Sequence, residues 1–288
     1  MAISFKGMSK LGVVFQTTLG VRGDVSDGKL QVMTWKKETI KTPQPIHLCD
    51  EDGNVENDGD INVNVGLTRV NDYMWTVIGG DGDRLWFADH EDGIILELSQ
   101  DDYSIIGTYS APDVTTSVGG ANAKAGVAIS SNHDFVYWAL RKNNTGNPTK
   151  IYKLNIADMS VALVHDIYNG GADIRCYPAG MSVDDNFVWM CSSLFGGADI
   201  RLFKFDLNLN PISETDFRDI DPVIFNFGTH APVSIDSTGE KLRVIRGDFT
   251  AAVPKTVFIV DIATMKVEDM FDLNLPEDER LRSIVKRN

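Results

Sequence analysis

The sequence is poor in cysteine, and its three cysteines form no pattern. Cys49, Cys176 and Cys191 are an odd number without the spacing of a metal site. If the polar turn at 184–186 sets the register of the strands beside it, Cys176 and Cys191 lie too far apart for a disulfide. We therefore expect three free thiols, buried as ordinary packing residues.

Basic residues are also scarce. The 288 residues include 27 Lys and Arg against 41 Asp and Glu, a formal net charge of −14. Nucleic acids and anionic membrane surfaces both require a basic patch, so neither is an expected partner. No apolar run approaches the roughly 18 residues that cross a bilayer, and residues 1–15 lack the apolar stretch and cleavage site of a signal peptide. We expect a soluble protein made in the cytoplasm.

The common catalytic signatures are missing as well. The sequence contains no GxSxG, HExxH, Walker A or CxxC motif. No reaction class is therefore indicated by a motif, and we expect no cofactor.

The sequence does contain a repeated strand pattern. Residues 178–206 predict a meander of three strands, and the middle strand, at 187–191, is apolar at nearly every position. A strand that is apolar on both faces has to be covered on both faces. Other sheets must therefore pack above and below it.

The same unit recurs along the chain. A polar turn followed by an apolar strand returns at 78–88, 129–139 and 234–245. The third strands end at Ser99, Asn155, Asp206 and Asp261, at intervals of 56, 51 and 55 residues (155 − 99, 206 − 155, 261 − 206). Four-stranded units repeated every 50 or so residues, about the length of a blade, indicate a β-propeller. We predict an all-β, five-bladed β-propeller with four-stranded antiparallel blades.

The repeats resemble those of a known superfamily. The pattern SxDxxx followed by three apolar residues, and the segment VFIVDIATMKVEDMF at 257–271, are similar to the repeats of TolB-like and YVTN (lactonase-like) β-propellers. The similarity extends over about residues 75–275. It implies the propeller architecture. Because the superfamily includes enzymes, periplasmic binding modules and scaffolds, it does not imply one function.

We predict one domain over residues 1–288. The strand at 281–286 would close the ring by pairing with the strand at 10–19, which removes a free sheet edge. Trp138 and Trp189, on second strands, should be buried between blades. The predicted segments are blade 1 at 10–49 plus 281–286, an acidic insertion at 50–66, blade 2 at 73–110, blade 3 at 124–168, blade 4 at 178–217 and blade 5 at 231–272.

The acidic insertion resembles a calcium loop in composition. The EF-hand pattern requires glycine at its sixth position, where a count from Asp50 gives Val55. We interpret the segment as a solvated loop. The alternative is a calcium site that takes its ligands from Asp50, Asp52, Asn54, Asp58 and Asp60.

Connection lengths distinguish the two faces of the predicted disc. Short polar turns join first to second and third to fourth strands, whereas long connections lie on the other face. Long loops on a rigid scaffold usually carry function, so we expect this long-loop face to bind a partner. The hexapeptide GGADIR occurs there twice, at 170–175 and 196–201, and supplies Asp and Arg for polar recognition. The candidate contact residues are Asp173, Arg175, Tyr177, Asp199, Arg201 and His230.

These features favour a non-catalytic protein-interaction or assembly module, for example a structural component of a virus or phage particle. Two alternatives stay open. Loops rich in aromatic residues, Asn and Asp would also suit a carbohydrate-binding, lectin-like propeller. A glycosidase or lactonase would need carboxylates in the central funnel, and its candidate residues are Asp89, His90 and Asp248.

Overall fold

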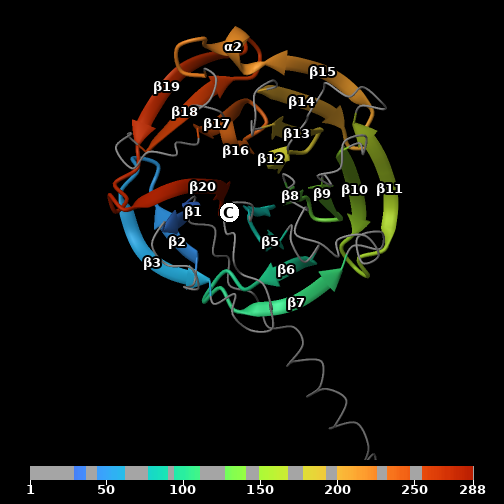
Figure 1. The fold of residues 1–288 in the computed structure, drawn as a ribbon. Helices are drawn as coiled ribbons and strands as arrows, with labels where there is room; N and C mark the ends of the chain where they lie inside the picture. Colours follow the sequence, from blue (N-terminus) through green and yellow to red (C-terminus); the bar gives the residue numbers. More distant parts are fainter. Residues whose placement is uncertain are drawn as a thin grey trace, which may run out of the picture.

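The computed structural model describes residues 29–36, 44–61, 77–89, 94–110, 127–140, 149–167, 178–192, 200–225, 232–246 and 255–287. Within these ranges the strands form five four-stranded antiparallel sheets around a central axis (Figure 1). The fold is the predicted all-β, five-bladed β-propeller. No helix in the described ranges is long and apolar enough to cross a bilayer.

The blades follow one another around the ring, and the strands of each blade run from the axis to the rim (Figure 1). Blade 1 consists of β20 (Glu279–Lys286), β1 (Leu30–Lys36), β2 (Gln44–Cys49) and β3 (Val55–Ile61). Blade 2 consists of β4 (Val77–Gly80), β5 (Leu85–Asp89), β6 (Ile94–Leu98) and β7 (Ile105–Ser110). Blade 3 consists of β8 (Val127–Ser131), β9 (Phe135–Leu140), β10 (Thr149–Asn155) and β11 (Val161–Ile167). Blade 4 consists of β12 (Pro178–Val183), β13 (Phe187–Ser192), β14 (Arg201–Asp206) and β15 (Pro211–Asp216). Blade 5 consists of β16 (Pro232–Ser237), β17 (Lys241–Arg246), β18 (Thr256–Asp261) and β19 (Lys266–Asp272).

The second strands are apolar on both faces because each face meets a different neighbour. In blade 3, Tyr137 packs with residues of blade 4, whereas the next residue, Trp138, packs with residues of blade 2. Trp138 and Trp189 are 0% and 2% exposed, which confirms their predicted burial. Of the described cysteines, Cys49 and Cys191 are buried and form no disulfide, as expected. The result is a separate apolar core at each of the five blade interfaces.

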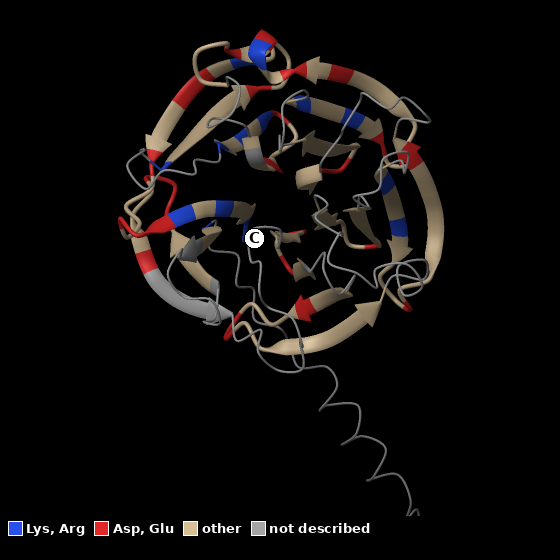
Figure 2. Cartoon of the chain, in the orientation of Figure 1, with Lys and Arg blue, Asp and Glu red and all other residues tan. Residues whose placement is uncertain are grey.

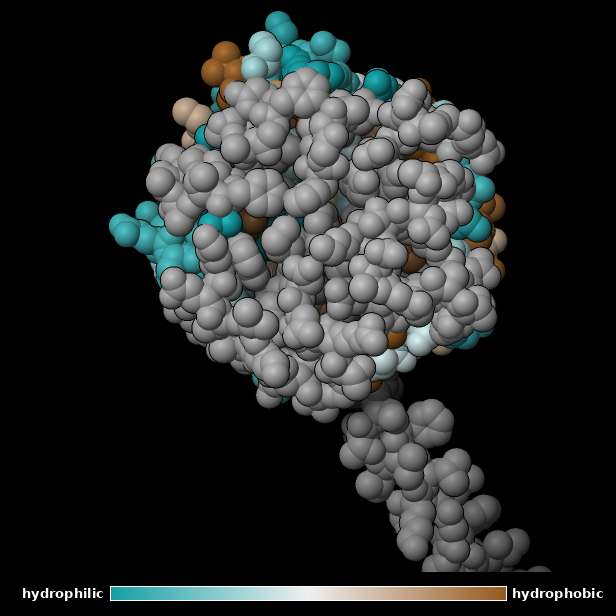
Figure 3. Space-filling model, viewed as in Figure 1, coloured by the Kyte–Doolittle hydropathy of each residue, from teal (hydrophilic) through white to brown (hydrophobic). Residues whose placement is uncertain are grey.

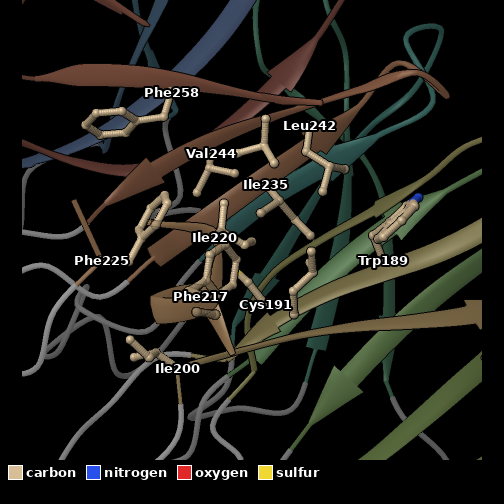
Figure 4. Packing of buried hydrophobic residues seen from close by; sticks show 13 residues of the cluster. Trp189, Cys191, Ile200, Phe217, Ile220, Phe225, Ile235, Leu242, Val244 and Phe258 are labelled. Carbon is tan, nitrogen blue, oxygen red and sulfur yellow. The ribbon is translucent and has the colours of Figure 1, made fainter. Parts of the chain in front are cut away.

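The core between blades 4 and 5 has a cover that the sequence patterns did not predict (Figure 4). A short helix, α2 (Phe217–Ile220), follows β15 and buries Phe217 and Ile220. Phe225 lies between Phe217 and Phe258, with ring centroids 5.0 and 5.8 Å apart. This connection therefore extends the interblade core toward the long-loop face.

Serine hydroxyls and a glycine hold the inner strands close together. A Cβ atom on Gly180 would lie 2.4 Å from the Cα of Ser234, so only glycine allows the two inner strands to approach this closely. Three hydroxyls each accept a hydrogen bond from a backbone N–H of the next blade, at 2.7 to 3.1 Å: Ser182 from Ser237, Ser234 from Ile284 and Ser283 from Ile78.

The ring closes through the last described strand, and its partner among the described strands is β1. β20 pairs antiparallel with β1, so that Leu30 lies opposite Lys286; the predicted partner strand at 10–19 lies outside the described ranges. Register explains the choice, because this pairing places Val32 in the core shared with blade 5 and Met33 in the core shared with blade 2.

The segment at 50–66 is not an insertion, which corrects the prediction. Its residues Val55–Ile61 form β3, the outer strand of blade 1. The sequence pattern predicts the third and fourth strands of blade 1 at residues 29–35 and 45–49, one position too late: residues 30–36 form the second strand of the blade and residues 44–49 the third.

Every outer strand has a β-bulge near its start, at the second residue of β3, β7, β11 and β15 and at the third residue of β19. In each blade the register with the third strand skips one residue at this point. A bulge interrupts the row of backbone groups at a sheet edge and discourages pairing with another strand there. The bulged residues are Glu56, Ile106, Ala162, Ile212 and Glu268.

Candidate functional site

A polar recess opens at the face of the short turns, and we call it the funnel. Its volume is about 320 Å³. Segments 80–82, 131–133, 182–186 and 236–239, which join the first and second strands of blades 2 to 5, line it together with Lys286 at the end of β20. All five blades therefore contribute to one recess.

The turns that form the funnel are held by their own polar side chains. Asp81 Oδ1 accepts hydrogen bonds from the backbone N–H groups of Asp83 and Arg84, at 3.1 and 2.8 Å. Asn132 and Asp184 cap the equivalent turns of blades 3 and 4 in the same way. Each such side chain replaces backbone partners that a tight turn leaves unpaired. These hydrogen bonds stabilise the turn conformations that form the lining.

Asp184 also joins two blades. Its Oδ2 accepts hydrogen bonds from the indole Nε1 of Trp189 and from the hydroxyl of Ser237, both at 2.8 Å. A comparable link joins blades 2 and 3, where Trp86 Nε1 donates to Ser131 Oγ at 2.8 Å. The polar lining is thus connected directly to the buried tryptophans of the interblade cores.

Asp236 is the buried carboxyl of the funnel. It is 6% exposed, and its Oδ2 accepts a hydrogen bond from Arg243 Nη1 at 3.0 Å. Burial raises the pKa of Asp236, although the nearby charge and hydrogen bond of Arg243 and the backbone of Lys286 act in the opposite direction. A carboxyl with a raised pKa in a recess is a feature that structural ion pairs share with acid–base sites.

The funnel is acidic and has no aromatic wall. Its lining contains Asp81, Asp184, Asp185 and Asp236 against Lys286 and the imidazole of His133, and contains no Phe, Tyr or Trp. It offers oxygen acceptors to a cationic group and none of the three large aromatic side chains that stack on sugar rings. Asp185 is exposed, so its carboxylate is accessible to a ligand.

The candidate contact residues of the long-loop face lie mostly outside the described ranges. Arg201 alone is described; Asp173, Arg175, Tyr177, Asp199 and His230 are not. Arg201 begins β14 and forms an ion pair with Glu214 of β15, and both side chains are about one third exposed. Its charge is therefore balanced within its own blade. Most of the surface turned to the viewer in Figure 3 belongs to residues outside the described ranges.

The carboxylates predicted for an enzyme active site at the long-loop end of the central channel are not brought together in the described residues. Asp89 is the last residue of β5, and His90 and Asp248 lie outside the described ranges. Their pairing stays a prediction. The structure instead brings a different carboxyl, Asp236, into a recess on the opposite face.

The described part of the calcium candidate is a turn. Asp50 Oδ1 accepts hydrogen bonds from the backbone N–H groups of Asp52 and Asn54, at 3.0 and 2.7 Å, and Oδ2 accepts one from Asn54 Nδ2 at 2.9 Å. These hydrogen bonds, with that of the Asn54 side chain the largest, lower the pKa of Asp50. Asp58 and Asp60 lie on β3.

The same turn recurs in blade 4, between β14 and β15. Asp206 accepts hydrogen bonds from Asn208 and Asn210 in the same pattern, at 2.8 to 2.9 Å. Asp50 therefore serves the turn between third and fourth strands. Across the described ranges, no three His, Cys, Asp or Glu side chains are grouped to hold a metal ion.

Sequence reasoning missed the funnel because it assigned function to the long connections. A signal was available: Asp81, Asn132, Asp184 and Thr238 stand at the same place in four repeats. These residues are typical turn formers, so each one alone indicates only a turn. Their convergence follows from the closure of the ring.

Solved structures share the fold at low sequence identity. The chain is similar to a glutaminyl cyclase from Myxococcus xanthus (8% identity, TM-score 0.44, covering 74% of this chain and 70% of that one). It is also similar to a chain of a nidogen/laminin complex (12%, 0.47, 90% and 98%) and to TolB from Acinetobacter baumannii (14%, 0.44, 90% and 56%). No protein-family model matches the sequence, and no curated protein matches it. With TM-scores below 0.5, these similarities indicate no particular function.

Proposed function

We propose that the chain is a non-catalytic protein-interaction module and that its funnel binds a basic segment of a partner protein. The observation that carries the proposal is the acidic, hydrogen-bonded lining of the funnel. A cation that enters it meets several carboxylates without having to reorganise them, and preorganised sites lose less free energy on binding. A lysine or arginine side chain, or an amino terminus, has the required charge and size.

The hydrogen bonds of the lining favour binding over turnover. One oxygen of Asp81 and both oxygens of Asp184 already hold turn backbones or join blades. Carboxylates with such structural roles are poorly suited to exchange protons with a substrate. Asp185 is the lining carboxylate best placed to contact a partner, because it is exposed.

The test uses two synthetic peptides of equal length, one rich in lysine and one rich in glutamate, and isothermal titration. The wild type should bind the lysine peptide, bind it more weakly at high salt, and ignore the glutamate peptide. Asp185→Lys should weaken binding by about tenfold or more. Asp219→Lys, an equal charge change at an exposed residue of α2, is the matched control and should have little effect. Equal affinity of wild type and Asp185→Lys would refute the funnel as the binding site.

The raised pKa of Asp236 supports a second candidate, an acid–base enzyme with its site in the funnel. The discriminating experiment is hydrolysis of glycosides and lactones by the wild type and by Asp236→Asn. Activity that the substitution abolishes would favour the enzyme. A lack of turnover by the wild type, together with binding of the lysine peptide, would favour the interaction module.

More specifically, we propose that this interaction module is a structural component of a virus or phage particle. This role is supported by the absence of catalytic motifs and by the acidic, Asn- and Asp-rich sequence. In this role the long-loop face would supply a second contact surface. Recovery of the chain from purified particles at a constant ratio to the other particle proteins would support the role, and its absence from them would count against it.

A further inference from the structure

The rim of the disc differs in charge from one blade to the next. The outer strands of blades 4 and 5, β15 and β19, carry Glu214, Asp216, Glu268, Asp269 and Asp272. In contrast, β7 of blade 2 has no charged residue, and β11 of blade 3 has none before His165. Figure 2 shows this difference as red bands on β15 and β19 and long tan stretches on β7 and β11. We call the sector formed by β7 and β11 the neutral rim.

Apolar side chains are exposed on the neutral rim. Val161, Leu163 and Val164 of β11 are 39%, 37% and 38% exposed, and Ile106 of β7 is 53% exposed. Brown surface is visible at the right-hand edge of Figure 3, where Figure 1 places β11. The charged strands β15 and β19 each expose one large apolar residue, Ile212 at 50% and Met270 at 62%, whereas β11 exposes several close together. Isolated apolar residues are common on protein surfaces, and neighbouring ones are not.

The outer edge of β11 pairs with none of the described strands. β11 is the outermost strand of its sheet, and its bulge at Ala162 interrupts the edge only near the start. From Leu163 to Ile167 the register with β10 is regular. Proteins commonly place charged side chains on such edges to prevent pairing with another strand. Between the bulge and the end of β11, Asp166 is the one acidic residue.

We propose that β11 pairs antiparallel with β11 of a second copy of this chain, so that two propellers share one continuous sheet. A two-fold axis makes the pairing self-complementary, because each copy presents the same strand. The charge favours a second copy at this sector, since two molecules with a net charge of −14 repel one another and repel least where neither carries local charge.

The proposal is independent of the funnel and predicts the opposite response to salt. Salt screens the repulsion between two acidic copies, so dimerisation should strengthen as the salt concentration rises. Binding of a basic segment in the funnel should weaken under the same change. The two proposals can therefore fail separately.

The test is sedimentation velocity of the full chain over a range of concentrations, at low and at high salt. The variants are Leu163→Lys and Val164→Lys, which place a charge on the outer edge of β11. The matched control is Ser213→Lys, an equivalent position of β15 on the charged rim. Thermal melting of each variant checks that the fold is intact, and having two rim variants keeps the test valid if one of them does not fold.

We expect a concentration-dependent dimer that high salt strengthens, a dissociation constant raised about tenfold or more by either rim variant, and no effect of Ser213→Lys. A wild type that stays monomeric at high salt overturns the proposal. A dimer that tolerates the rim variants, or that Ser213→Lys weakens equally, also overturns it, because the interface would then lie elsewhere.

Discussion

Glu279 Oε2 lies 2.5 Å from the Nε2 of His47, although 232 residues separate them in the sequence. The same carboxylate oxygen accepts a hydrogen bond from the hydroxyl of Thr34, and all three residues are at most 2% exposed. The three residues come from β20, β1 and β2, so this buried group connects the closing strand to the next two strands of blade 1.

Removal of the Glu279 carboxylate should therefore weaken the closed ring. Glu279→Ala leaves His47 and Thr34 buried without their common partner, which should lower the free energy of unfolding by about 3 kcal/mol. Urea denaturation measures the change. Glu268→Ala, which breaks the exposed ion pair with Lys241, is the control and should cost less than about 1 kcal/mol. Similar losses in the two variants would show that the buried group has no special role.

The two ends of the sequence should differ in their importance for closure. Deletion of residues 281–288 removes most of β20 and exposes the edge of β1, so it should lower the free energy of unfolding by several kcal/mol, about 4 or more. Deletion of residues 1–19 leaves the pairing of β20 with β1 in place and should cost less than about 1 kcal/mol. The melting temperatures of the two truncated chains decide the question. An unchanged melting temperature after removal of 281–288 would contradict closure by β20.

Asp236 should make stability depend on pH in a specific direction. Its pKa is raised above the ordinary value of 3.8 by burial, so the folded state holds this proton at a higher pH than the unfolded state does. The contribution of the protonated group is present below about 3.8 and is lost as the pH rises through the folded-state pKa. Asp236→Asn is neutral at every pH, so it does not lose this contribution to stability. The stability of the variant relative to the wild type should therefore increase with pH.

Chemical denaturation at a series of pH values from acid to neutral tests this expectation. The difference in the free energy of unfolding between the wild type and Asp236→Asn should be smallest at the acid end, where Asp236 is neutral in the wild type. A difference that grows toward low pH would mean that the Arg243 charge dominates and that the folded-state pKa is lowered instead. Asp219→Asn, at an exposed residue, provides a control without burial.

The long-loop face carries its own prediction. If Arg175 and Asp199 contact a protein partner near the centre of an interface, reversing both charges should weaken association by about 1 to 2 kcal/mol. The melting curve should stay nearly unchanged. Arg201 is the informative comparison, because Glu214 already balances its charge. Arg201→Glu should therefore lower stability as well as any binding. Association that survives the Arg175 and Asp199 reversals would show that the partner does not bind at these two residues.

The fold could be predicted from the sequence because the apolar pattern of each repeat indicates which strands must be covered on both faces. The apolar second strands require two covered faces, and Trp138 and Trp189 are buried as that rule demands. The turn residues Asp81 and Asp184 were recognisable as turn formers. The four-residue helix α2 was missed because so short a segment shows no helical periodicity.

The partner of β20 was not predictable from pattern alone. Residues 10–19 and 30–36 are both apolar enough to form the neighbouring strand, and the choice depends on which register fills two interblade cores with residues such as Val32 and Met33. The funnel was missed for a similar reason. Its position depends on the angle between successive blades around the central axis. The sequence of a single repeat does not show this angle. The ion pair of Asp236 with Arg243 was within reach, since the two residues face each other across one hairpin.

The indole hydrogen bonds at the funnel give the protein an intrinsic optical signal. Of the five tryptophans, Trp86 and Trp189 donate to lining residues, Ser131 and Asp184. A charged group that enters the funnel changes the electric field at these indoles, and tryptophan emission responds to such fields. Occupancy of the funnel can therefore be followed by the wavelength of intrinsic fluorescence, without a label and without a substitution in the lining.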